Sequence, residues 1–139
     1  IVAYYLKAFD ALPKVETFNL SVETENCRIN EDVILFLVIN GRNVAGFSDF
    51  FKKADIEDGL IDILLFRNSK PKELLNLLIK IMSKELSSDS RMIHIRAKEC
   101  RIQSEKQVQI CVDGESGTLL PIHVKCIHPA VKLFVNKID

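Results

Sequence analysis

The stretch Gln109-Ile-Cys-Val-Asp-Gly-Glu-Ser-Gly117 joins a strand-like run to a turn that holds two acids and two glycines. Apolar residues alternate at positions 108, 110 and 112, which predicts a half-buried strand. Asp113 and Glu115 are two residues apart, so an extended backbone would direct both carboxylates to the same side. Paired carboxylates at a strand end suit a metal ion or the activation of a hydroxyl nucleophile. Asp-Gly is also a turn signal, and spacing alone favours a solvated hairpin turn.

Strand-like runs surround this stretch and outnumber the helical ones. Residues 33–39 are apolar at every position, as in a central strand covered on both faces. A helix is expected from an N-cap at Ser69 to about residue 86, because apolar residues recur there at helical spacing. The other expected elements are a helix over residues 1–12 and strands over residues 18–22, 61–66, 92–97, 99–104, 120–127 and 131–135. Strands in succession favour a mainly β (α+β) fold, an antiparallel β-sandwich or barrel with one or two attached helices.

The composition fits a single folded domain. The 139 residues are 47% apolar and 27% charged with a formal net charge of zero, so no overall field attracts nucleic acid. No apolar run approaches the roughly 20 residues that span a bilayer, so we expect a soluble cytoplasmic protein. The four cysteines lack C-x-x-C spacing, which favours reduced thiols over a disulfide-built secreted module. The chain starts at Ile1 without an initiator Met, so we expect a piece of a longer protein.

A second loop also combines acids with a glycine. Asp55, Glu57 and Asp58 precede Gly59. Carboxylates on flexible loops suit an oxygen-ligand cation such as Mg²⁺ or Ca²⁺, but the remaining ligands of an EF-hand are missing. Spacing alone therefore leaves a metal site as the weaker of two interpretations, beside an ordinary solvated loop.

Common catalytic signatures are absent from the sequence. His94, His123 and His128 lack metal-ligand spacing, and we expect them at surface or hydrogen-bonded positions. G-x-S-x-G, Walker A and G-x-G-x-x-G motifs do not occur. As a free-standing enzyme, the chain looks incomplete.

An ordered set of short motifs nevertheless carries a family resemblance. Together they resemble the C-terminal domain of the soluble bacterial diacylglycerol kinase and related lipid kinases. That family is similar to the eukaryotic diacylglycerol, ceramide and sphingosine kinases, and more distantly to the NAD kinases. The motifs are A-Y-Y-L-K (3–7), N-G-R-N-V-A-G-F (40–47), A-D-I-E-D-G-L-I-D (54–62), V-D-G-E-S-G (112–117) and L-P (120–121).

The resemblance implies a two-domain kinase that transfers the ATP γ-phosphoryl group to a lipid hydroxyl at the membrane surface. The family's N-terminal domain carries a G-G-D-G-T nucleotide loop, which does not occur here. Residues 1–139 therefore resemble the β-sandwich domain alone, and we expect this fragment to be inactive by itself. The resemblance also implies ATP and Mg²⁺ as cofactors and peripheral contact with a membrane. It is compatible with a homodimer.

The resemblance implies catalytic roles for three residues. Asp113 matches the aspartate that is a proposed general base for the lipid hydroxyl, and Glu115 belongs to the same network. Lys7 matches the lysine after Y-Y-x, a candidate for phosphate contacts. A carboxylate within hydrogen-bond reach of an attacking hydroxyl favours phosphoryl transfer, which depends mainly on positioning and charge neutralisation.

The resemblance also implies a structural Mg²⁺ at the 55–60 loop. Asp58 matches its carboxylate ligand. The backbone carbonyls of Asp55 and Leu60 match the other two protein ligands, Asp55 by position and not by side chain.

Two other functions stay open. One is a non-catalytic β-sandwich module that binds lipid, and the other is a kinase that acts on a soluble acceptor. The D-G-E turn and the Y-Y-x-K segment argue against the soluble acceptor.

Overall fold

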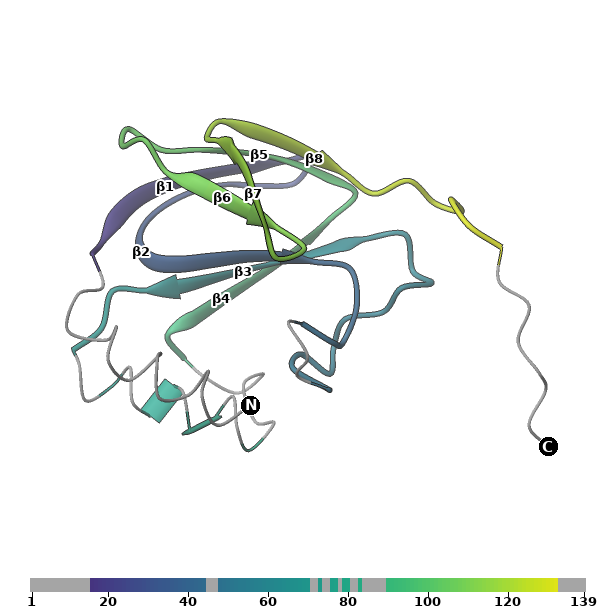
Figure 1. Ribbon diagram of the computed structural model, residues 1–139, viewed down its shortest axis with the longest axis horizontal. Helices are drawn as coiled ribbons and strands as arrows, with labels where there is room; N and C mark the ends of the chain where they lie inside the picture. Colours follow the sequence, from purple (N-terminus) through teal and green to yellow (C-terminus); the bar gives the residue numbers. More distant parts are fainter. Residues whose placement is uncertain are drawn as a thin grey trace.

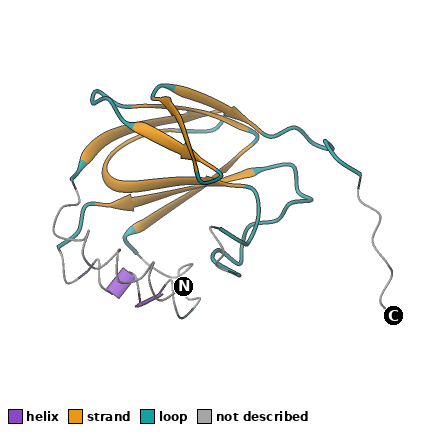
Figure 2. Ribbon diagram, in the orientation of Figure 1, coloured by secondary structure: helices purple, strands orange, loops and turns teal. Residues whose placement is uncertain are grey.

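The computed structural model describes residues 16–44, 48–70 and 90–132, together with residues 73, 76, 77, 79, 80 and 83. The expected helix over residues 1–12 and Lys7 lie outside these ranges. The described part of the chain is dominated by antiparallel strands (Figures 1 and 2). These are β1 (Phe18–Thr24), β2 (Arg28–Ile39), β3 (Ile61–Arg67), β4 (Met92–Ala97), β5 (Glu99–Gln103), β6 (Gln109–Val112), β7 (Glu115–Leu119) and β8 (Ile122–Lys125).

The strands form two antiparallel sheets. Six of them pair in the order β4-β3-β2-β1-β5-β8, and β6 pairs with β7 in a separate hairpin. The large sheet coils, so that β5 and β8 lie on the opposite side of the interior from β3 and β4 (Figure 1), and Ile110 of the β6–β7 hairpin packs against this interior. The expected β-sandwich-like architecture is confirmed.

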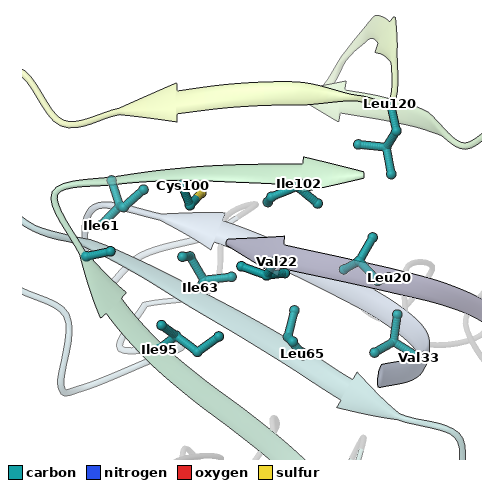
Figure 3. Packing of buried hydrophobic residues seen from close by; sticks show 11 residues of the cluster. Leu20, Val22, Val33, Ile61, Ile63, Leu65, Ile95, Cys100, Ile102 and Leu120 are labelled. Carbon is teal, nitrogen blue, oxygen red and sulfur yellow. The ribbon is translucent and has the colours of Figure 1, made fainter. Parts of the chain in front are cut away.

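The interior of the coiled sheet is the main hydrophobic core. Ile63 and Leu65 on β3 point into the same space as Cys100 and Ile102 on β5 (Figure 3). Alternation along each strand directs every second side chain to this side. The buried members of the cluster are Leu20, Val22, Val33, Ile61, Ile63, Leu65, Ile95, Ala97, Cys100, Ile102 and Leu120.

The other face of β3 is buried as well. Leu64 and Phe66 pack there against Phe50, Phe51 and Ala54 of the preceding loop, and Leu77 joins this second cluster. All six residues of β3 from Ile61 to Phe66 are buried, which explains why five of the six are apolar.

The strand expected at residues 33–39 is only partly covered. It forms the second half of β2, but Leu35 remains 45% exposed. The register shifts between Val33 and Leu35, and this irregularity interrupts the pairing with β3. The expectation of cover on both faces is therefore wrong at Leu35.

Two element predictions need correction in the C-terminal third. Strand β7 was not expected, because its sequence E-S-G-T-L does not alternate between apolar and polar residues. Residues 131 and 132 are not in a strand, so the described start of the run at residues 131–135 is irregular.

The described residues of the expected 69–86 helix include five helical positions, 73, 76, 77, 79 and 80. The expected cap at Ser69 is displaced by one residue. The Lys70 N–H donates to Glu73 Oε2 at 3.1 Å and the Glu73 N–H donates to the Lys70 carbonyl at 2.8 Å, as at a helix N-terminus. The Ser69 hydroxyl instead donates to the Arg67 carbonyl.

Candidate functional site

The acidic turn is a two-residue hairpin between β6 and β7. Val112 pairs with Glu115, and both central residues have positive φ, 50° at Asp113 and 93° at Gly114. Positive φ at both positions is the type I′ geometry that matches the twist of a hairpin, and Asp-Gly is a preferred sequence for it. The hairpin interpretation of the sequence is correct.

The hairpin holds two carboxylates at an exposed tip. The side chains of Asp113 and Glu115 are both exposed, and neither has a hydrogen bond or ion pair within the described part of the chain. Gln109 donates to the Ser116 hydroxyl at 2.6 Å and ties the two strands together behind the tip. The turn thus presents two negative charges to the solvent.

Gly117 lies just behind this tip, in β7. A Cβ added there would meet Ile110 Cγ1 and Val112 Cγ2 at 3.0 Å. The glycine therefore allows close packing of the two strands, whereas Gly114 supplies the backbone conformation of the turn.

The 55–60 loop is built from two successive side-chain-to-backbone turns. Asp55 Oδ1 accepts the Glu57 N–H at 2.9 Å, and Asp58 Oδ1 accepts the Leu60 N–H at 2.8 Å. Gly59 has a φ of 71°, which the second turn requires. The acids of this loop thus have a local structural role that does not depend on a metal.

The contacts of Asp58 bear directly on the expected Mg²⁺ site. One carboxylate oxygen accepts the Leu60 N–H, and the other forms an ion pair with the Arg96 guanidinium of β4. The described residues contain no group of three or more His, Cys, Asp or Glu side chains able to hold a metal ion. As these side chains lie, they do not fit a divalent cation, which would first have to displace Arg96. The metal ligands Asp58, Asp55 and Leu60 remain a prediction.

A buried aspartate beneath this loop was missed by sequence reasoning. Asp62 on β3 has no exposed surface, and its Oδ1 lies 2.5 Å from Nε2 of His94 and 3.6 Å from Nε of Arg96. Its Oδ2 has no hydrogen-bond partner among the residues that the structure describes. The expectation that His94 is a hydrogen-bonded residue agrees with this contact.

Sheet register explains the cluster. Asp62 is directly opposite Arg96 and Leu64 is opposite His94 in the β3–β4 pair, so Asp62, His94 and Arg96 share one face. The signal in the sequence was an acid inside an apolar run, I-D-I-L-L-F. Pairing that run with residues 92–97 would have located the partners.

The cluster is enclosed on one side by the loop before β3. The Phe51 ring meets the His94 ring edge to face, with centroids 4.7 Å apart. Arg42 donates from Nε to the Ala54 carbonyl at 3.3 Å, and its own carbonyl accepts the Phe51 N–H at 3.2 Å. The N-G-R segment thereby positions the aromatic residue over the histidine.

The acidic turn and the 55–60 loop are separate features in the described structure. No hydrogen bond or ion pair joins them among the described residues, and the placement of Lys7 is not described. The catalytic assignments of Asp113, Glu115 and Lys7 remain predictions.

Known proteins resemble this chain in sequence and in fold. A family model described as the YegS C-terminal NAD kinase beta sandwich-like domain matches residues 1–135. The diacylglycerol kinase of Bacillus subtilis (strain 168) is 25% identical over 120 residues, 86% of this chain and 40% of that protein. The diacylglycerol kinase of Staphylococcus haemolyticus (strain JCSC1435) is 29% identical over 119 residues, 86% of this chain and 36% of that protein.

Solved structures show the same fold. A crystal structure of a diacylglycerol kinase from Bacillus anthracis str. Sterne matches with a TM-score of 0.69 at 23% identity, over 88% of this chain and 42% of that one. A second structure from the same strain gives a TM-score of 0.74 at the same identity. The chain thus spans less than half the length of these relatives. It belongs to the family of YegS C-terminal NAD kinase beta sandwich-like domains.

Proposed function

We propose that this chain is the C-terminal domain of an ATP-dependent lipid kinase that phosphorylates a diacylglycerol-like hydroxyl. The observation that carries the proposal is the exposed D-G-E turn, with its type I′ geometry, in a chain of this family. The curated relatives that match along the chain are named diacylglycerol kinases.

Asp113 has the chemistry of a general base. An exposed carboxylate on a fixed turn can accept the proton of an attacking hydroxyl that is brought within hydrogen-bond distance. Glu115 adds a second negative charge beside it. Since both charges lack partners in the described part of the chain, the turn suits a cleft completed by a second, cation-bearing body.

An apolar neighbour favours a lipid acceptor over a soluble one. Val112 directly precedes Asp113 and is 53% exposed. An exposed β-branched residue beside the proposed base offers an acyl chain a place to pack while its hydroxyl reaches the carboxylate. No helix in the described part of the chain is long and apolar enough to cross a bilayer. We propose that the kinase binds its lipid substrate at the membrane surface.

The nucleotide is proposed to bind a second domain. G-G-D-G-T does not occur in the 139 residues, and the matched relatives are more than twice as long as the aligned part. ATP would supply the phosphoryl group and Mg²⁺ would offset its charge. We expect the isolated chain to lack kinase activity.

The test is a kinase assay with radiolabelled ATP and dioleoylglycerol in mixed micelles, run on the isolated chain and on the reading frame that contains it. Only the longer protein should be active. Asp113→Asn should lower its kcat about 10²–10⁴-fold while leaving it folded, because Asn-Gly also fits a type I′ turn. Val112→Ser should raise KM for dioleoylglycerol more than it lowers kcat.

Asp49→Asn is the matched control, since Asp49 is the other described aspartate with positive φ, 53°. Unchanged activity in Asp113→Asn would remove the general base from the proposal. A long protein that phosphorylates soluble alcohols better than any lipid would overturn the acceptor class.

A further inference from the structure

Arg96 lies between two acids that come from different parts of the chain. Its Nη2 forms an ion pair with Oδ2 of Asp58 in the 55–60 loop, and its Nε lies 3.6 Å from Oδ1 of Asp62 on β3. The side chain of Asp62 is fully buried, that of Asp58 is 23% exposed and that of Arg96 is 41% exposed. One guanidinium therefore connects the loop to the strand beneath it.

We propose that Arg96 is the resident cation of the 55–60 loop and holds it in place without a divalent metal. This is the location at which the family resemblance implies Mg²⁺. The planar guanidinium presents donors in a fork and can contact two carboxylates at once. With Arg96 on Oδ2 and the Leu60 N–H on Oδ1, both oxygens of Asp58 are already engaged.

The position of Arg96 is set by the sheet and not by the loop. Asp62 and Arg96 are directly opposite in the β3–β4 register, so their side chains emerge on the same face. The sheet therefore positions the positive charge independently of its contact with Asp58. The ion pair with Asp58 then fastens the loop to a side chain that the sheet already positions.

The buried carboxylate of Asp62 makes this charge necessary. A buried acid is costly unless it is paired, and Asp62 Oδ2 finds no hydrogen-bond partner in the described part of the chain. His94 and Arg96 both contact its other oxygen. Replacing Arg96 by a neutral residue would leave negative charge in the strand and in the loop above it.

The inference does not rest on kinase activity. It concerns the charge that stabilises a loop, and its readout is thermal unfolding. If the proposed kinase function proved wrong, the role of Arg96 would be unaffected. If the role of Arg96 proved wrong, the proposed kinase function would be unaffected.

The first measurement is the Tm of the 139-residue chain in EDTA and in MgCl₂, with NaCl added to match ionic strength. The Tm should be the same in both. A saturable rise of several degrees in MgCl₂ that is abolished by Asp58→Ala would overturn the proposal, because the metal and not Arg96 would then hold the loop.

The second measurement compares arginine variants in EDTA. Arg96→Met should lower Tm by roughly 6–12 °C, the effect of uncovering a buried charge in a domain of this size. Arg96→Lys should recover part of the loss, since it keeps the charge but not the fork. Arg67→Met is the matched control. Arg67 forms a two-bond pair with Glu31 at 3.0 and 3.4 Å on the exposed surface, and its loss should cost at most about 3 °C.

A Met variant at Arg96 that is as stable as wild type in EDTA would also overturn the proposal. If Arg96→Met does not fold, the Tm of wild type in EDTA and in MgCl₂ still tests whether a metal holds the loop. The Tm of Arg96→Lys then reports the contribution of the guanidinium.

Discussion

Nε2 of His94 lies 2.5 Å from Oδ1 of Asp62, an aspartate with no exposed surface in the middle of an apolar strand. The pair joins β3 to β4 on the face covered by Phe51. It lies on the same face of β3 as Leu64 of the second hydrophobic cluster.

The two side chains should be strongly coupled. In a double-mutant cycle with Asp62→Asn and His94→Gln, we expect a coupling free energy of about 1–3 kcal/mol in urea unfolding, because the bond is removed from water. The pair of His123 and Glu99 serves as the comparison. These atoms are 3.3 Å apart with side chains 49% and 47% exposed, so their coupling should be below about 0.5 kcal/mol. Equal coupling in both pairs would contradict a special role for burial.

Gly114 should be sensitive to substitution for a backbone reason alone. Its φ is 93°, yet an added Cβ would meet nothing within 4 Å. Gly114→Ala should therefore lower the free energy of unfolding by about 1–2 kcal/mol through strain in the turn. Gly114→Asn should cost less, because asparagine tolerates positive φ better than alanine. If Gly114→Asn lowers the free energy of unfolding as much as Gly114→Ala does, a cause other than the turn geometry is responsible.

The four cysteines should differ in reactivity, since all are free thiols in different surroundings. Cys111 is exposed, whereas Cys100 is buried. Burial, with a further contribution from the charge of Glu25, raises the pKa of the Cys100 thiol to about 11. At pH 8, iodoacetamide should label Cys111 in the folded chain and reach Cys100 only after unfolding, as peptide mass spectrometry would show. Fast labelling of Cys100 in the folded chain would contradict its burial.

The same shift in pKa gives a direction for pH dependence. The folded chain keeps the Cys100 proton to a higher pH than the unfolded chain, whose thiol titrates near 9.0. The protonated Cys100 thiol therefore contributes to the stability of the folded chain fully below pH 9, and this contribution is lost as the pH rises through about 11. The urea midpoint should therefore fall more steeply between these values in wild type than in Cys100→Ala.

Phe51 should act as the anchor of the loop before β3. It is fully buried although it lies outside any strand, and it packs against both the second cluster and His94. Phe51→Ala should lower the free energy of unfolding by about 3–5 kcal/mol, measured in urea. Lys52→Ala, at the exposed neighbouring position, should change it by less than about 0.5 kcal/mol. A loss at Phe51 no larger than at Lys52 would mean that the loop is not anchored there.

The sequence predicts most strands because their apolar patterns are local. The run that became β3 is apolar at five of its first six positions, with Asp62 as the exception, and the geometry of the Asp113-Gly114 turn follows from its two residues. Strand β7 could not be predicted this way. It exists because β6 offers a partner, with Gln109 opposite Leu119, and not because of its own pattern.

The contacts of the candidate sites depend on pairing across long separations. Arg96 and Asp58 are 38 positions apart, and His94 and Asp62 are 32 apart. Local spacing therefore identified Asp58 as an acid on a loop but could not reveal that Arg96 forms an ion pair with it. The register of β3 with β4 supplies that information, and it requires the fold.

Strand β3 contributes alternate side chains to both hydrophobic clusters, Ile63 and Leu65 to one and Leu64 and Phe66 to the other. Displacement of β3 from the sheet would therefore disrupt both clusters. The interior of the coiled sheet and the layer beneath it share this strand, so any local opening that displaces β3 is opposed by the packing free energy of both.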